Sequence, residues 1–105
     1  MVTFHPSVVE YLDRLGKQLF DAGYFGFHDS AIRYIRKMVD YITVHLSTAP
    51  AKPAPDYFKK YGTFMQYITY NPNKQTTWYV FFQQKGTDYL IRYITNNHSE
   101  GQYIR

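Results

Sequence analysis

Residues Thr76-Thr-Trp-Tyr-Val-Phe-Phe-Gln83 form the most apolar run of this chain, and they decide its fold. Their β-branched and aromatic side chains favour a strand, and bulky residues fall on both sides of it. A strand that is apolar on both faces needs cover from two sides. We therefore expect this run to be the central strand of a sheet.

Two further strand-like segments flank this central run. Residues 63–70 are rich in aromatic and β-branched side chains, and the turn Asn71-Pro-Asn-Lys74 joins them to it. Residues 88–95 follow on its other side, after a hairpin turn at Lys85-Gly86. Short turns join antiparallel neighbours, so the three segments predict an antiparallel sheet.

The first half of the chain predicts a short strand at residues 2–5 and then two helices. Apolar residues recur at helical spacing from Val8 to Leu19 and again from Ile32 to Leu46. A short link between two amphipathic helices indicates an antiparallel pair. We expect the apolar stripes of both helices to cover the sheet. In the second helix the stripe consists of Ile32, Ile35, Val39, Ile42 and Leu46.

A proline-rich connector at residues 47–56 leads from the helices into the sheet. Too little chain lies on either side of this connector for it to be a domain boundary. We therefore predict a single α+β domain over residues 1–105. Its helical hairpin packs on a three- to four-stranded antiparallel sheet, in the order strand, helix, helix, strand, strand, strand.

The composition excludes several classes of protein. The chain has no cysteine, so disulfides and thiolate chemistry are excluded. No apolar run approaches the roughly 20 residues that span a bilayer, and the N-terminus lacks a signal-peptide pattern. No two of the four histidines share a metal-ligand spacing, and no glycine-rich phosphate loop is present. We expect a cytoplasmic protein without membrane contact, metal or cofactor.

Positive charge is concentrated in the second half of the chain. Residues 1–56 carry six Lys or Arg and six Asp or Glu. Residues 57–105 carry six against two, which accounts for the whole net charge of +4. This half also holds most of the predicted strands and many of the 12 tyrosines. Cations interleaved with tyrosines suit RNA with bases free to stack, although tyrosine also favours strands and lysine protects sheet edges.

The end of the last predicted strand carries several chemically active side chains. Residues 89–95 run into Asn96-Asn97-His98, and Tyr103 and Arg105 follow. Histidine titrates near neutral pH, so His98 can serve as an acid or a base. Arg92 shares its strand parity with His98, which predicts that both side chains point to one face.

This order of elements resembles the RelE/ParE superfamily of bacterial toxins from toxin–antitoxin modules. The resemblance covers nearly the whole chain. It includes the central strand Thr77-Trp-Tyr-Val-Phe-Phe82 and a last strand, Ile91-Arg-Tyr-Ile94, that runs into Asn96-Asn97-His98. The resemblance implies a cognate antitoxin as partner. It also implies one of two activities: ribosome-dependent cleavage of mRNA, or action against DNA gyrase without nuclease residues.

The resemblance implies roles for individual residues if the chain is a metal-independent endoribonuclease. His98 and Tyr103 stand at positions that match the site of such nucleases. Arg92, which shares the strand parity of His98, completes the catalytic set, with His98 as acid or base and Arg92 at the phosphate. The RNA-binding set consists of Lys59, Lys60, Asn97 and Arg105. The arginine that such nucleases carry on the central strand is missing, because Thr77 or Trp78 stands there. That loss favours a gyrase-directed or non-catalytic toxin, and a small basic RNA-binding domain is a third reading.

Overall fold

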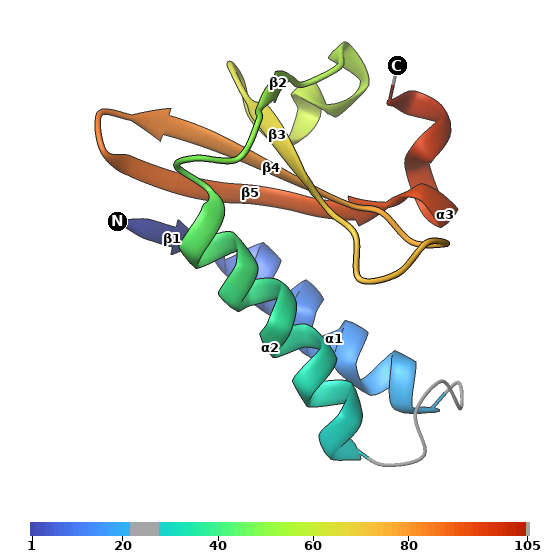
Figure 1. The fold of residues 1–105 in the computed structure, drawn as a ribbon. Coiled ribbons are helices and arrows are strands. Elements are labelled where there is room, and N and C mark those ends of the chain that lie inside the picture. Colours follow the sequence, from blue (N-terminus) through green and yellow to red (C-terminus); the bar gives the residue numbers. More distant parts are fainter. Residues whose placement is uncertain (22–27, 105) are drawn as a thin grey trace.

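The computed structural model describes residues 1–21 and 28–104, which form two layers (Figure 1). Two long helices, α1 (Pro6–Asp21) and α2 (His28–His45), lie on one face of a five-stranded sheet. The strands follow the order β1-β5-β4-β3-β2 across that sheet. Their bounds are β1 (Val2–Phe4), β2 (Lys52–Pro53), β3 (Gln66–Tyr70), β4 (Trp78–Lys85) and β5 (Asp88–Asn96).

Three short helical segments lie in the second half of the chain. The 3-10 helix η1 (Asp56–Tyr61) follows β2. The single turn α3 (Asn97–Glu100) and the 3-10 turn η2 (Gly101–Tyr103) follow β5 directly. The chain after α3 rises on the side of the sheet away from α1 and α2 (Figure 1).

The prediction of an α+β domain with two helices on a sheet is confirmed, but the details of the sheet were wrong. The sheet has five strands and is mixed, because β1 pairs with β5 in parallel. The two helices carry the chain back across the sheet, so the first strand meets the last one. The Met1 carbonyl accepts a hydrogen bond from the Tyr89 backbone N–H at 2.8 Å.

The fifth strand comes from the proline-rich connector. Lys52 and Pro53 pair with Tyr67 and Gln66 at the edge of the sheet. Proline is tolerated on an edge strand because its missing N–H faces away from the ladder. Proline in the connector therefore did not exclude a strand.

The larger core lies between the helices and the sheet. Leu12 of α1 and Ile42 of α2 pack in one cluster with Val80, Phe82 and Ile91 of the sheet. These aliphatic and aromatic side chains are almost completely buried. Burial against both helices thus explains why the side chains on this face of the sheet are apolar. We call it the helix-covered face.

The apolar stripe predicted for α2 is only partly buried. Met38 and Ile42 are fully buried, whereas Ile32 is 40% exposed and Ile35 and Val39 are half-buried. The buried side of the helix is therefore rotated slightly from the predicted stripe. None of the described helices is long and apolar enough to cross a membrane.

The opposite face of the sheet, which we call the outer face, carries a second and smaller core. Phe81 of β4 is fully buried there, between Phe58 of η1 and Tyr67 of β3. The ring centroids of Phe58 and Phe81 lie 4.4 Å apart. The segment from β2 to η1 thus covers part of the outer face, and the predicted apolar residues on both faces of β4 have their two layers of cover.

Candidate functional site

A group of tyrosines and charged side chains surrounds this second core. We call it the outer-face cluster. Its members come from η1, β5 and the C-terminal turns, so four segments contribute to it. They are Tyr57, Lys60, Tyr61, Arg92, Tyr93, Glu100 and Tyr103.

The exposed end of the cluster is a pair of stacked rings. The rings of Tyr57 and Tyr103 are parallel within 2°, and their centroids lie 3.6 Å apart. Tyr57 is 36% exposed and Tyr103 is 38% exposed. The pair therefore joins η1 to the C-terminal turn and still presents aromatic surface to solvent.

Lys60 connects this pair to the rest of the cluster. Its ammonium lies 3.9 Å from the Tyr57 ring centroid and 5.4 Å from that of Tyr61. A cation over an aromatic face is attracted by the negative charge of the π-system. Contact with the Tyr57 side chain, as the largest cause, raises the pKa of Lys60. The ammonium therefore remains charged at neutral pH.

A second stack lies on the sheet itself. The rings of Tyr61 and Tyr93 are 3.7 Å apart and parallel within 6°. Arg92 donates a hydrogen bond from Nε to the Tyr61 carbonyl at 3.0 Å. Phe81 pairs with Tyr93 and Phe82 pairs with Ile91, so Arg92 is the extra residue of a β-bulge. The bulge aims Arg92 and Tyr93 toward η1 together.

Glu100 closes the cluster from the C-terminal side. The Tyr93 hydroxyl donates a short hydrogen bond to Glu100 Oε1. Burial, followed by this bond, raises the pKa of Tyr93 well above its usual value. Tyr93 is therefore a neutral donor at neutral pH, and it holds the Glu100 carboxylate beside η1.

The outer-face cluster brings together three of the residues that the sequence singled out. These are Lys60, Arg92 and Tyr103. Lys59 lies next to the cluster but forms an exposed ion pair with Asp56, with Nζ and Oδ1 3.9 Å apart. Arg105 lies outside the described residues.

His98 and Asn97 lie elsewhere. His98 Nε2 is 3.2 Å from Thr76 Oγ1, at the end of the β3–β4 connection. Asn97 accepts a hydrogen bond from the Thr77 N–H at 2.9 Å and donates one to the Gln75 carbonyl at 3.0 Å. Asn97 thus fastens α3 to that connection.

The prediction that His98 and Arg92 share a face was wrong. Strand alternation ends at Asn96, because Asn96 caps α3 by accepting hydrogen bonds from the His98 and Ser99 N–H groups. The bulge at Arg92 shifts the alternation as well. His98 instead lines a separate cavity of about 680 Å³ on the helix side. Trp78 and Tyr34 line this cavity too, and the Trp78 indole N–H donates a hydrogen bond to the Tyr34 hydroxyl at 2.9 Å.

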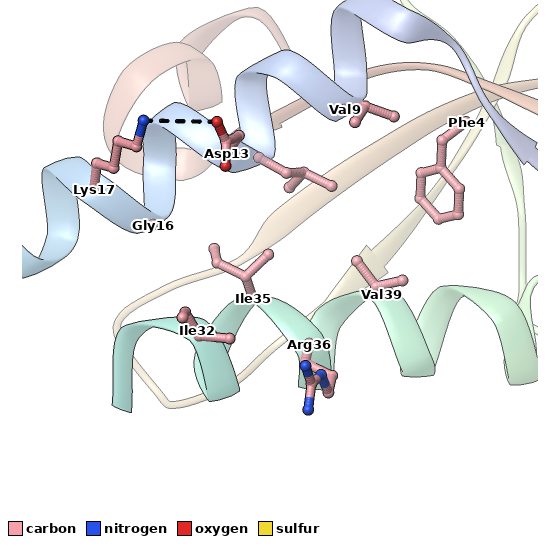
Figure 2. A pocket seen from close by; sticks show the side chains of 10 residues that line it. Phe4, Val9, Asp13, Gly16, Lys17, Ile32, Ile35, Arg36 and Val39 are labelled. Carbon is pink, nitrogen blue, oxygen red and sulfur yellow. Dashed lines mark ion pairs between the residues drawn. The ribbon is translucent and has the colours of Figure 1, made fainter. Parts of the chain in front are cut away.

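A further hollow of about 560 Å³ lies between α1 and α2 (Figure 2). Ile35 and Val39 project from α2 toward α1, and Val9 is 55% exposed beside them. At the rim, Lys17 pairs with Asp13 at 3.8 Å. Ile32, Ile35 and Val39, which the sequence assigned to the side of α2 that covers the sheet, therefore line an open apolar groove.

Four members of the outer-face cluster escaped sequence reasoning. The missed residues are Tyr57, Tyr61, Tyr93 and Glu100. Only one local signal pointed to them, the spacing of Tyr57 and Lys60 three residues apart in a helical turn. Within the described residues, no group of three or more His, Asp or Glu side chains lies close enough to hold a metal ion.

Comparison with known proteins identifies no relative. No family model, no curated protein and no solved structure matches this chain.

Proposed function

We propose that this chain is the RelE/ParE-like toxin of a toxin–antitoxin pair, and that its outer-face cluster binds RNA. The observation that carries the proposal is the cluster itself: Lys60 and Arg92 lie among two stacked tyrosine pairs. Proteins bind single-stranded RNA through cations that meet the phosphates and aromatic rings that stack on bases. The concentration of net positive charge in residues 57–105 supports the same partner.

The activity we propose is metal-independent cleavage of ribosome-bound mRNA through attack of the RNA 2′-hydroxyl. Lys60 meets the phosphate as it gains negative charge, since its ammonium is exposed and stays protonated. Arg92 lies one contact deeper and supports the Tyr61 backbone. The outward ring surface of Tyr103 orients a base. Because the ribosome is the target, the protein acts in the cytoplasm.

The antitoxin is the second partner, and we assign it to the groove between α1 and α2. The walls of the groove are apolar, formed by Val9, Ile32, Ile35 and Val39 among others. Arg36 at its rim makes no ion pair within the described part of the chain. An amphipathic antitoxin helix with an acidic flank fits both properties, because its apolar face fills the groove and a carboxylate meets Arg36.

A translation assay tests the proposal. Purified protein is added to a translation extract, and primer extension maps the mRNA ends. We expect new 5′ ends within translated codons in the presence of wild-type protein, and fewer with Lys60→Ala. Intact mRNA at protein concentrations that arrest growth would contradict RNA cleavage.

The alternative of a gyrase-directed or non-catalytic toxin is supported by β4. The outer side of this central strand presents Tyr79, Phe81 and Gln83, none of which is charged. Trp78 is buried and bonded to Tyr34 on the helix side. Inhibition of DNA supercoiling without mRNA cleavage would select this alternative. Normal growth on expression of the free protein would leave only a small basic RNA-binding domain.

A further inference from the structure

The outer-face cluster lacks the histidine that the sequence offered as acid or base. His98 lies with Thr76, Tyr34 and Trp78 on the other side of the sheet. The cluster does contain one carboxylate, Glu100, which the sequence did not single out. A carboxylate held within reach of a substrate hydroxyl can act as a general base.

We propose that Glu100 accepts the proton of the RNA 2′-hydroxyl, with Lys60 beside it as the cation that faces the phosphate. This role rests on the RNA cleavage proposed above. It replaces His98 by a residue that the fold brings into the cluster.

The first support is the fixed position of the carboxylate. Glu100 is half-buried and receives the Tyr93 hydroxyl on Oε1. Tyr93 is in turn stacked on Tyr61 and follows the bulged residue Arg92, so the donor itself has little freedom. A catalytic carboxylate held by packed neighbours loses little entropy when substrate arrives.

The second support is the protonation state of its neighbours. Burial raises the pKa of Tyr93, so Tyr93 stays neutral and cannot compete as the base. The Lys60 pKa is raised by contact with Tyr57 and further by the charge of Glu100, so Lys60 keeps its charge. Glu100 is the one carboxylate among the members of the outer-face cluster.

The chemical step balances as follows. Glu100 takes the 2′ proton while the 2′ oxygen forms a bond to phosphorus. The bond from phosphorus to the 5′ oxygen breaks, and water donates a proton to that leaving oxygen. Protonated Glu100 then returns its proton to the resulting hydroxide. The products are a 2′,3′-cyclic phosphate and a 5′-hydroxyl, and the proposed step uses no metal ion.

The decisive experiment compares Glu100→Gln with His98→Gln in the same mRNA cleavage assay. Glutamine keeps an acceptor for the Tyr93 hydroxyl but cannot take a proton. We expect Glu100→Gln to slow single-turnover cleavage about 100-fold or more, with binding of a 2′-deoxy substrate within threefold of wild type. We expect His98→Gln to cleave within threefold of wild type.

Two results would overturn different parts of the proposal. If wild-type protein cleaves RNA and Glu100→Gln cleaves within threefold of it, Glu100 is not the base. If His98→Gln shows the 100-fold loss instead, the proton acceptor lies on the helix side. If the wild-type protein cleaves no RNA, the proposed function fails, and the role of Glu100 fails with it.

A second variant distinguishes proton transfer from a structural role. Tyr93→Phe removes the hydrogen bond by which the Tyr93 hydroxyl stabilises the charged form of the Glu100 carboxylate. We expect the acid limb of the cleavage pH profile to move to higher pH, while the folded fraction at pH 7 is unchanged. An unshifted acid limb would contradict the proposal.

The groups that face Glu100 are Tyr93 of β5, Tyr57 and Lys60 of η1, and, at longer range, Tyr11 of α1.

Discussion

Both faces of the sheet bury apolar side chains, but different kinds of residue cover them. On the helix-covered face, Val80, Phe82 and Ile91 meet aliphatic side chains of α1 and α2. On the outer face, Phe81 meets Phe58 inside a ring of tyrosines, and Tyr57 and Tyr103 at its edge stay partly exposed. The first face contributes stability and little chemistry. The second face contributes a smaller core that holds charged groups in place, so function is expected there.

Substitution of Phe81 and of Phe82 tests this comparison most directly. The two residues are neighbours on β4 and point to opposite faces, and they are 0% and 2% exposed. We expect Phe82→Ala to lower the free energy of unfolding by about 3–5 kcal/mol, and Phe81→Ala by a similar amount. Urea unfolding measures both. Losses of this size approach the total stability of a small domain, so Phe→Leu at each position provides milder variants.

The two leucine variants then separate stability from function. We expect Phe81→Leu to weaken RNA binding, because Phe81 supports Phe58 and Tyr93 beneath the cluster. We expect Phe82→Leu to leave the affinity of the folded protein unchanged. Equal losses of affinity in both variants would mean that the outer face has no special role.

The sequence predicts the helix-covered face far better than the outer one. Periodicity located both helices and the strands at residues 63–70, 76–83 and 88–95 to within a few residues, because each pattern is local. The parallel pairing of β1 with β5 joins residues 86 or more apart and leaves no local pattern. The short strand β2 was missed because proline normally argues against a strand.

The candidate site was predicted only in part for the same reason. The sequence singled out Lys60, Arg92 and Tyr103, which the structure brings together, but it gave no sign of the stack of Tyr57 on Tyr103, which joins positions 46 residues apart. The bulge at Arg92 and the helical turn after Asn96 both break the alternation that a strand pattern assumes. Those two irregularities moved His98 out of the site.

The attachment of the C-terminal turns provides the next test. Asn97 makes two side-chain hydrogen bonds to the β3–β4 connection. At about 1 kcal/mol for each bond, we expect Asn97→Ala to lose about 2 kcal/mol by urea unfolding. Asn96→Ala removes a helix cap and is expected to lose about 1 kcal/mol. A larger loss for Asn96→Ala would show that the cap, and not the link to Gln75 and Thr77, holds α3.

Alkaline pH tests the Tyr93–Glu100 contact. Burial raises the Tyr93 pKa above that of a tyrosine in the unfolded chain, which ionises near pH 10. The folded state then binds more protons than the unfolded state above pH 10, so stability is complete below that pH and falls as pH rises. We expect the urea midpoint to fall less steeply between pH 10 and 11.5 in Tyr93→Phe. Burial also raises the pKa of Tyr11 and Tyr70, so part of the fall remains.

The smallest effect is expected at Lys59, which makes it the matched control for Lys60. The two lysines are adjacent and both exposed, but only Lys60 lies over tyrosine rings, while Lys59 pairs loosely with Asp56 at the surface. Exposed ion pairs of this kind contribute little, so we expect Lys59→Ala to change the free energy of unfolding by less than about 0.5 kcal/mol.

If the outer-face cluster binds RNA, Lys60→Ala lowers the salt dependence of binding by about one released ion, and Lys59→Ala lowers it less. Titration of a 2′-deoxy oligonucleotide at several salt concentrations measures both slopes. Equal slopes for the two variants would mean that RNA senses only the general positive charge of this half of the chain, and that the stacked tyrosines around Lys60 serve packing alone.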